Sequence, residues 1–146
     1  MRGVKELGEK GERDMAKLIR AKTVEMDNKY DPAVFIEFGI DSNTVENPKV
    51  VFGHTIWPAG KRNQRHYHIM ADSGIYIIKG RMRVFAGPSH EEQEFIAEVG
   101  DFIYIPQGEI HSLLNLSTEP AEIVFYYGGV RNKDEAQTVW LEPPLD

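Results

Sequence analysis

Three histidines are the residues whose type and spacing suit metal chemistry. His66 and His68 stand two apart in a segment that is typical of a β-strand, so both imidazoles project from one face of it. His111 lies on another predicted strand, where it can meet the first two inside a folded domain. Neutral imidazole is a common ligand for divalent transition metals. A His-x-His pair alone also fits two ordinary hydrogen-bonded histidines, so the surrounding elements must decide between these interpretations.

Short β-rich runs follow one another from residue 33 onward, separated by clusters of Gly, Pro, Asn and Asp, which is typical of an all-β sandwich or barrel. We expect a β-barrel over residues 33–130, after an N-terminal extension at 1–32 and before a C-terminal tail at 131–146. The tail carries Trp140, so it should pack on the barrel or on a partner subunit. The predicted strands are Ala33 to Gly39, Lys49 to Trp57, Gln64 to Met70, Ile75 to Lys79, Met82 to Ala86, Glu94 to Val99, Phe102 to Ile105, Ser112 to Asn115 and Ile123 to Tyr127.

The N-terminal extension carries Met15, Leu18 and Ile19 at the spacing of one helix face. This pattern predicts a short amphipathic helix from Arg13 to Lys22, which could pack on the barrel end or on a second subunit. Barrel edges and apolar terminal segments are commonly covered by pairing of subunits. We therefore expect a homodimer.

Composition limits the classes of function. The formal net charge of -6 disfavours binding to a phosphate backbone, so we expect no nucleic-acid partner. The chain has no cysteine, so any metal must be held by nitrogen and oxygen ligands. No stretch approaches the roughly 20 apolar residues that span a bilayer. The prediction is a protein without a membrane partner, located in the cytoplasm.

Glycine and proline recur at defined distances from the histidines. Five residues separate Gly60 from His66, and Gly80 closes the following strand pair. Downstream, the chain reads Gly-x5-Pro-x-Gly-x2-His-x3-Asn from Gly100 to Asn115. With these residues the chain resembles the cupin family, over roughly Lys49 to Tyr127. The resemblance implies a double-stranded β-helix, also called a jelly roll or cupin barrel, in which the three histidines hold one divalent metal ion.

One position departs from that family's pattern. A cupin places a glutamate ligand three or four residues after the second histidine, with six residues between it and the closing glycine. Here that count reaches Ser73 from Gly80, and Asp72 or Ser73 from His68. Serine does not replace an anionic ligand, so the site has either three histidines or three histidines plus Asp72. A regular strand from Ser73 points Asp72 the other way, which favours three histidines.

A three-histidine ligand set is neutral, so the bound ion keeps its full charge and suits a chelating, anionic small-molecule substrate. The arrangement is similar to that of the three-histidine iron dioxygenases within the family. We therefore expect a non-haem Fe(II) dioxygenase that cleaves a small keto/enol, hydroxy-aromatic or carboxylate substrate. Zn, Mn, Ni or Cu is also compatible with three imidazoles. The alternatives are a non-oxidative isomerase, lyase or cyclase, and a cupin that binds a small molecule without catalysis.

Two further side chains are candidate catalytic groups. Gln64 shares the inward face of the strand with His66 and could hydrogen-bond near the metal or only line the barrel mouth. Tyr76 is an alternative group for moving protons, although aromatic residues of strands usually serve in packing. His54 could enter the barrel as another imidazole or be a hydrogen-bonded core residue. Asn115 is expected to brace its strand.

Overall fold

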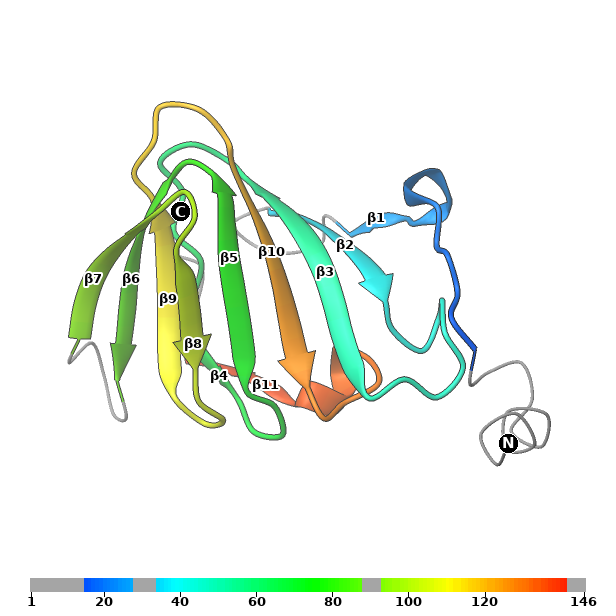
Figure 1. The fold of residues 1–146 in the computed structure, drawn as a ribbon. Coiled ribbons are helices and arrows are strands. Elements are labelled where there is room, and N and C mark those ends of the chain that lie inside the picture. The colour runs from blue at the N-terminus through cyan, green and yellow to red at the C-terminus, as the bar shows by residue number, and fades with distance from the viewer. Residues whose placement is uncertain (1–14, 28–33, 88–92, 142–146) are drawn as a thin grey trace.

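The computed structural model of the chain describes residues 15–27, 34–87 and 93–141. Within these ranges the predicted all-β fold is confirmed: strands pair antiparallel in a six-stranded sheet of order β1-β2-β3-β10-β5-β8 and a five-stranded sheet of order β11-β4-β9-β6-β7. The two sheets form the layers of one jelly-roll sandwich (Figure 1). The strands are β1 Met26–Asp27, β2 Phe35–Ile40, β3 Val50–Trp57, β4 His66–His68, β5 Ser73–Lys79, β6 Arg81–Gly87, β7 Gln93–Glu98, β8 Phe102–Ile105, β9 Ile110–Asn115, β10 Ala121–Gly128 and β11 Thr138–Trp140.

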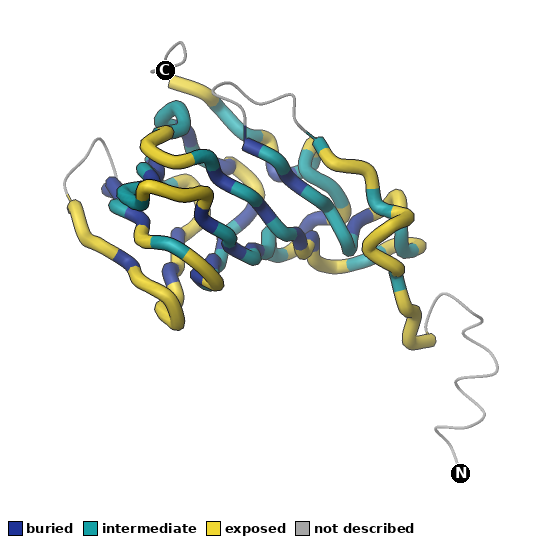
Figure 2. The backbone as a smooth tube through the Cα atoms, turned by 90° about the horizontal axis from the view of Figure 1, so that it is seen from above, coloured by how far each residue is buried: buried dark blue, intermediate teal, exposed yellow. Residues whose placement is uncertain are grey.

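Alternation of side chains along the strands builds the core between the layers. On β3, Val51 and Trp57 are buried, whereas Phe52 is 44% exposed on the opposite face. The same period of two runs along β5 and β10, so that both sheets direct apolar side chains inward. Figure 2 shows buried positions along the strands of both layers and exposed ones along the N-terminal segment. The sandwich therefore encloses the region where β4 and β9 carry their histidines.

The predicted amphipathic helix is wrong. Its first two residues lie outside the described ranges, and residues 15–20 are not helical; only a 3-10 turn, η2 Ala21–Thr23, forms nearby. Met15 and Leu18 are 63% and 71% exposed. A helix this short is marginal in water unless a packed face stabilises it. The spacing of apolar residues therefore does not produce a helix here.

A turn and a buried amide hold the two histidine strands in place. Gly108 adopts a φ of 83°, which favours glycine, and its amide donates a hydrogen bond to the carbonyl oxygen of His68 (2.9 Å). Asn115 is fully buried, and its Nδ2 donates to the carbonyl oxygens of Trp57 and Glu119, each at 3.0 Å. Asn115 therefore braces the end of β9, as predicted.

Two strands were not expected. β1 pairs with β2, and β11, which comes from the C-terminal tail, pairs with β4 so that Thr138 lies opposite His68 and Trp140 opposite His66. Each is at most three residues long, and so short a run carries little period-two signal. The described residues also contain no helix long and apolar enough to cross a membrane.

Candidate metal centre

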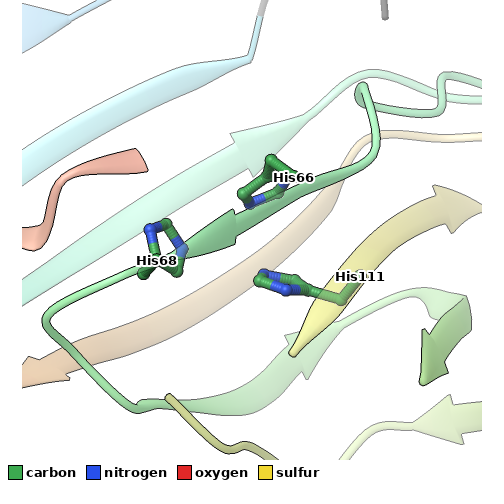
Figure 3. A group of neighbouring side chains, drawn as sticks. All are labelled: His66, His68 and His111. Atoms are coloured by element: carbon green, nitrogen blue, oxygen red, sulfur yellow. The ribbon is translucent and has the colours of Figure 1, made fainter. Parts of the chain in front are cut away.

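The three histidines converge in the interior. β4 supplies His66 and His68 from one face, and β9 supplies His111 directly opposite His66. One candidate ligand nitrogen from each ring lies within 4.8 Å of the other two, and all three residues are buried. Figure 3 shows the rings pointing toward one another from the two strands. The fold therefore brings the three histidines together, as the sequence predicts.

Hydrogen bonds to the Nδ1 atoms orient the rings. His66 Nδ1 donates to the carbonyl oxygen of Gln64 (2.8 Å), and His111 Nδ1 donates to that of Glu109 (2.9 Å). A carbonyl oxygen only accepts, so both rings carry their proton on Nδ1 and keep the lone pair on Nε2 for a metal. His68 Nδ1 lies 2.7 Å from the hydroxyl oxygen of Thr138, so the third ring also has a hydrogen-bond partner at Nδ1.

The electrostatics keep the imidazoles neutral. Burial, together with the neighbouring imidazoles, lowers the pKa of His66 well below its ordinary value. Burial and His111 lower the pKa of His68 to about 3, and burial lowers the pKa of His111 to about 4. A metal ion binds the unprotonated ring, so protons do not compete for this site near neutral pH. The residues therefore fit a divalent cation.

The histidines open into a cavity of about 410 Å³ between the two sheets. Its walls are mostly apolar and aromatic, and the C-terminal tail forms one of them. The ring of Trp140 packs on His66 with centroids 4.6 Å apart, and Tyr127 packs on His68 at 4.8 Å. The cavity thus combines a polar, metal-binding end with a surface for an apolar group.

The structure does not bring the two other candidate catalytic side chains to this cavity. Gln64 contributes its carbonyl oxygen to His66, but it is not among the described residues that line the cavity. Tyr76 lies on the other face of β5, with its ring 4.7 Å from that of Phe102. Alternation explains this placement, because Ser73 and Ile75 take the inward positions of β5.

Asp72 and His54 also lie away from the cluster. Asp72 accepts a hydrogen bond from the Tyr104 hydroxyl (3.0 Å) and does not line the cavity, so the described geometry supports the three-histidine set. His54 faces outward from β3, with Nδ1 2.9 Å from Glu37 and Nε2 3.3 Å from Glu122. Burial alone lowers the pKa of His54, but these carboxylates outweigh it and raise the pKa.

Sequence reasoning missed Thr138 as a partner of the site. The only local signal was Trp140, which marked the tail as a segment that packs. Replacing Thr138 with valine keeps the shape of the side chain but removes the hydroxyl that contacts His68. We expect the affinity for zinc to fall roughly 10- to 100-fold, as is typical when a partner of a metal-binding histidine is lost. Competition with a chromophoric chelator measures this, and Thr138→Ser should stay near wild type. Equal affinity of the valine and wild-type proteins would contradict the role of Thr138.

Comparison with known proteins agrees with this geometry. The family profile described as "Cupin domain" matches residues 53–127, about half of the chain, and that range includes all three histidines. The chain is 26% identical over 91 residues to the tetracenomycin polyketide synthase protein TcmJ of Streptomyces glaucescens, a match that covers 62% of this chain. It spans only 58% of the length of that relative.

Solved structures share the fold. KdgF from Halomonas sp. is similar with a TM-score of 0.64 and 15% identity, over 82% of this chain and 98% of that one. An oxalate oxidase in complex with the substrate analogue glycolate is similar with a TM-score of 0.70 and 16% identity, over 92% and 67% of the two chains. At these identities the likeness shows the jelly-roll arrangement alone.

Proposed function

Because the chain belongs to the cupin family, we propose that it is a metal-dependent enzyme that holds one Fe(II) ion and uses dioxygen to cleave a small chelating substrate. The observation that carries the proposal is the group of three buried, neutral imidazoles that opens into a cavity. Three protein ligands leave coordination positions for a substrate and a second small molecule, whereas purely structural sites are normally closed.

The ligand set supports the choice of substrate class. No carboxylate joins the three imidazoles among the described residues, so a divalent ion held there keeps its positive charge. An anionic substrate with two adjacent donor atoms would be attracted to it. Supporting this, a structural neighbour is an oxalate oxidase in complex with glycolate, a small hydroxy acid.

Each part of the cavity has a task in this reaction. A bound ferrous ion would pass electrons from the chelated substrate to dioxygen, whose two oxygen atoms enter the cleaved product. The imidazoles would hold the ion through Nε2, and their Nδ1 partners keep the rings in place. Trp140 and Tyr127 cover two of the rings and exclude water from that side. The apolar walls orient the non-chelating part of the substrate.

Oxygen consumption tests the proposal. The protein is loaded with Fe(II) without oxygen, then mixed with oxygenated buffer and one of four compounds: a β-diketone, a hydroxyacetophenone, gentisate or a small thiol. We expect one class to accelerate oxygen uptake at least tenfold over the iron-loaded protein alone, because the enzyme binds the chelate beside the oxygen site. His66→Ala protein prepared in the same way is the control. Uptake that is equal in the variant, or absent with all four classes, would count against the proposal.

A second candidate is a non-oxidative, metal-dependent reaction such as cyclisation or isomerisation. The similarity to a polyketide synthase protein favours it. Poly-β-keto compounds carry neighbouring keto and enol oxygens that can chelate a metal ion. In this case the zinc-loaded protein should convert a poly-β-keto compound without oxygen, as followed by mass spectrometry. Tight binding of that compound with no conversion under either condition would favour a binding protein instead.

A further inference from the structure

Ser73 has a buried hydroxyl for which the described residues offer no hydrogen-bond partner. The side chain is only 3% exposed, and within the described part of the chain its Oγ has no hydrogen-bond partner. Ser73 also lines the cavity that contains the three histidines. Buried hydroxyls are almost always hydrogen-bonded, because they lose their bonds to water on burial. An unpartnered one in a ligand-sized cavity therefore points to a group that binds there.

The fold places Ser73 on the wall that faces the histidines. It is the first residue of β5 and lies opposite Tyr127 of β10, and the Tyr127 ring packs on the ring of His68. The next inward residues of β5, Ile75 and Ile77, are apolar. Ser73 is thus the polar inward position of β5, and the residue opposite it, Tyr127, contacts a histidine of the group.

Three other polar side chains of the cavity wall have partners in the protein. Asn63 Oδ1 accepts a hydrogen bond from the Leu113 amide (2.8 Å), and Lys133 Nζ is 2.6 Å from Asp27 Oδ2. Thr138 is engaged with His68. Among the described residues of the wall, Ser73 carries the fully buried side-chain atom that lacks a hydrogen-bond partner, so its hydroxyl is available to a bound molecule.

We propose that the Ser73 hydroxyl donates a hydrogen bond to an acceptor atom of the anion that binds at the three histidines. It thereby selects anions with a second lone pair over ligands that bind the ion through their only lone pair. A hydroxyl suits this role better than a carboxylate, because it adds no negative charge and repels no anion. This inference rests on the proposed metal site, and it makes Ser73 a determinant of ligand specificity.

Binding of two small probes tests the inference without enzyme activity. The protein is loaded with Cu(II), its copper content is measured, and azide or pyridine is titrated by visible absorption. Azide can accept a hydrogen bond while bound to copper, whereas pyridine cannot, because its single lone pair is already used. In Ser73→Ala we expect the Kd of azide to rise roughly tenfold or more, as for a lost hydrogen bond to a charged group, and the Kd of pyridine to stay within about twofold.

Two further variants make the result specific. Ser73→Thr keeps the hydroxyl and should bind azide nearly as tightly as wild type. Ser112→Ala removes another buried serine hydroxyl, which accepts a hydrogen bond from Arg62 Nε (3.1 Å) and is not on the cavity wall, so azide binding should not change.

The outcomes separate the inference from the proposed function. If wild type binds about one copper per chain but Ser73→Ala leaves azide affinity unchanged, or weakens azide and pyridine equally, the inference is wrong and the metal site stands. If wild type binds no copper, zinc or iron, the proposed function fails and the inference fails with it.

Discussion

Replacing His111 with alanine is expected to lower the affinity of the protein for a divalent ion by roughly a hundredfold or more. This loss is larger than the one expected for Thr138→Val, because His111 would itself be a ligand and Thr138 only contacts one. His111 supplies the nitrogen on β9, and the two on β4 cannot enclose an ion by themselves. Protein purified without chelators should contain about one metal ion per wild-type chain and almost none per variant chain. Elemental analysis measures the content, and calorimetric titration with zinc measures the affinity.

The matched control is His54→Ala. His54 is likewise a histidine of a strand, but it is half-buried, and its ring lies between Glu37 and Glu122 on the outer face of the sheet. The control should keep the full metal content. Equal metal content in the wild-type and His111→Ala proteins would overturn the central assignment, and loss of metal in His54→Ala would show that metal content depends on the stability of the sheet.

The second large effect concerns acid. We expect the metal-free protein to lose stability as the pH falls from about 6.5 to about 5, because the unfolded chain protonates its histidines there while the folded chain keeps three of them neutral. The unfolded state binds more protons in this window, so the free energy of unfolding rises with pH. Each buried histidine contributes up to about 1.4 kcal/mol per pH unit. His68 continues to lower the free energy of unfolding as the pH falls, until the pH reaches its folded pKa of about 3.

Urea unfolding at several pH values, with a chelator present, measures this slope. His111→Asn removes one of the three groups, so it should lower the slope by up to about 1.4 kcal/mol per pH unit. His54 acts in the opposite direction: its folded pKa is raised, so its contribution is fully present below the unfolded value of 6.5 and is lost at higher pH. His54→Gln should therefore leave the slope between pH 6.5 and 5 nearly unchanged. A flat profile for the wild-type protein would contradict neutral burial of the cluster.

Some features of the site were predictable because they depend on local pattern. Alternation placed His66 and His68 on one face and turned Ser73 inward and Asp72 away from the metal. The same alternation from Ser73 already places Tyr76 on the outer face of β5, so the assignment of Tyr76 as a proton-moving group conflicted with a signal in the strand itself.

Local pattern misled at the N-terminal extension. Three apolar residues at helical spacing cannot form a stable helix unless another surface covers them, and Met15 and Leu18 are exposed. The strand Phe102 to Ile105, in contrast, has the predicted bounds. It lies between Asp101 and Pro106. These residue types end a strand through their own backbone chemistry, whatever surface the strand packs against.

Residue type and alternation were therefore enough to predict an all-β fold and to place His66 and His68 on one face. The spacing of glycine, proline and histidine added the resemblance to cupins, which implied the jelly roll, the third histidine of the group and the missing carboxylate. Only the tertiary structure assigned the partners that orient the rings and the wall that covers them. Thr138 lies 70 positions from His68 in the chain, and it reaches the ring only because β11 pairs with β4. Likewise, the outward environment of His54 depends on Glu37 and Glu122 from two neighbouring strands. Pairing of short, distant segments leaves no periodic trace in sequence, because its energy comes from contacts that form after the sheets assemble.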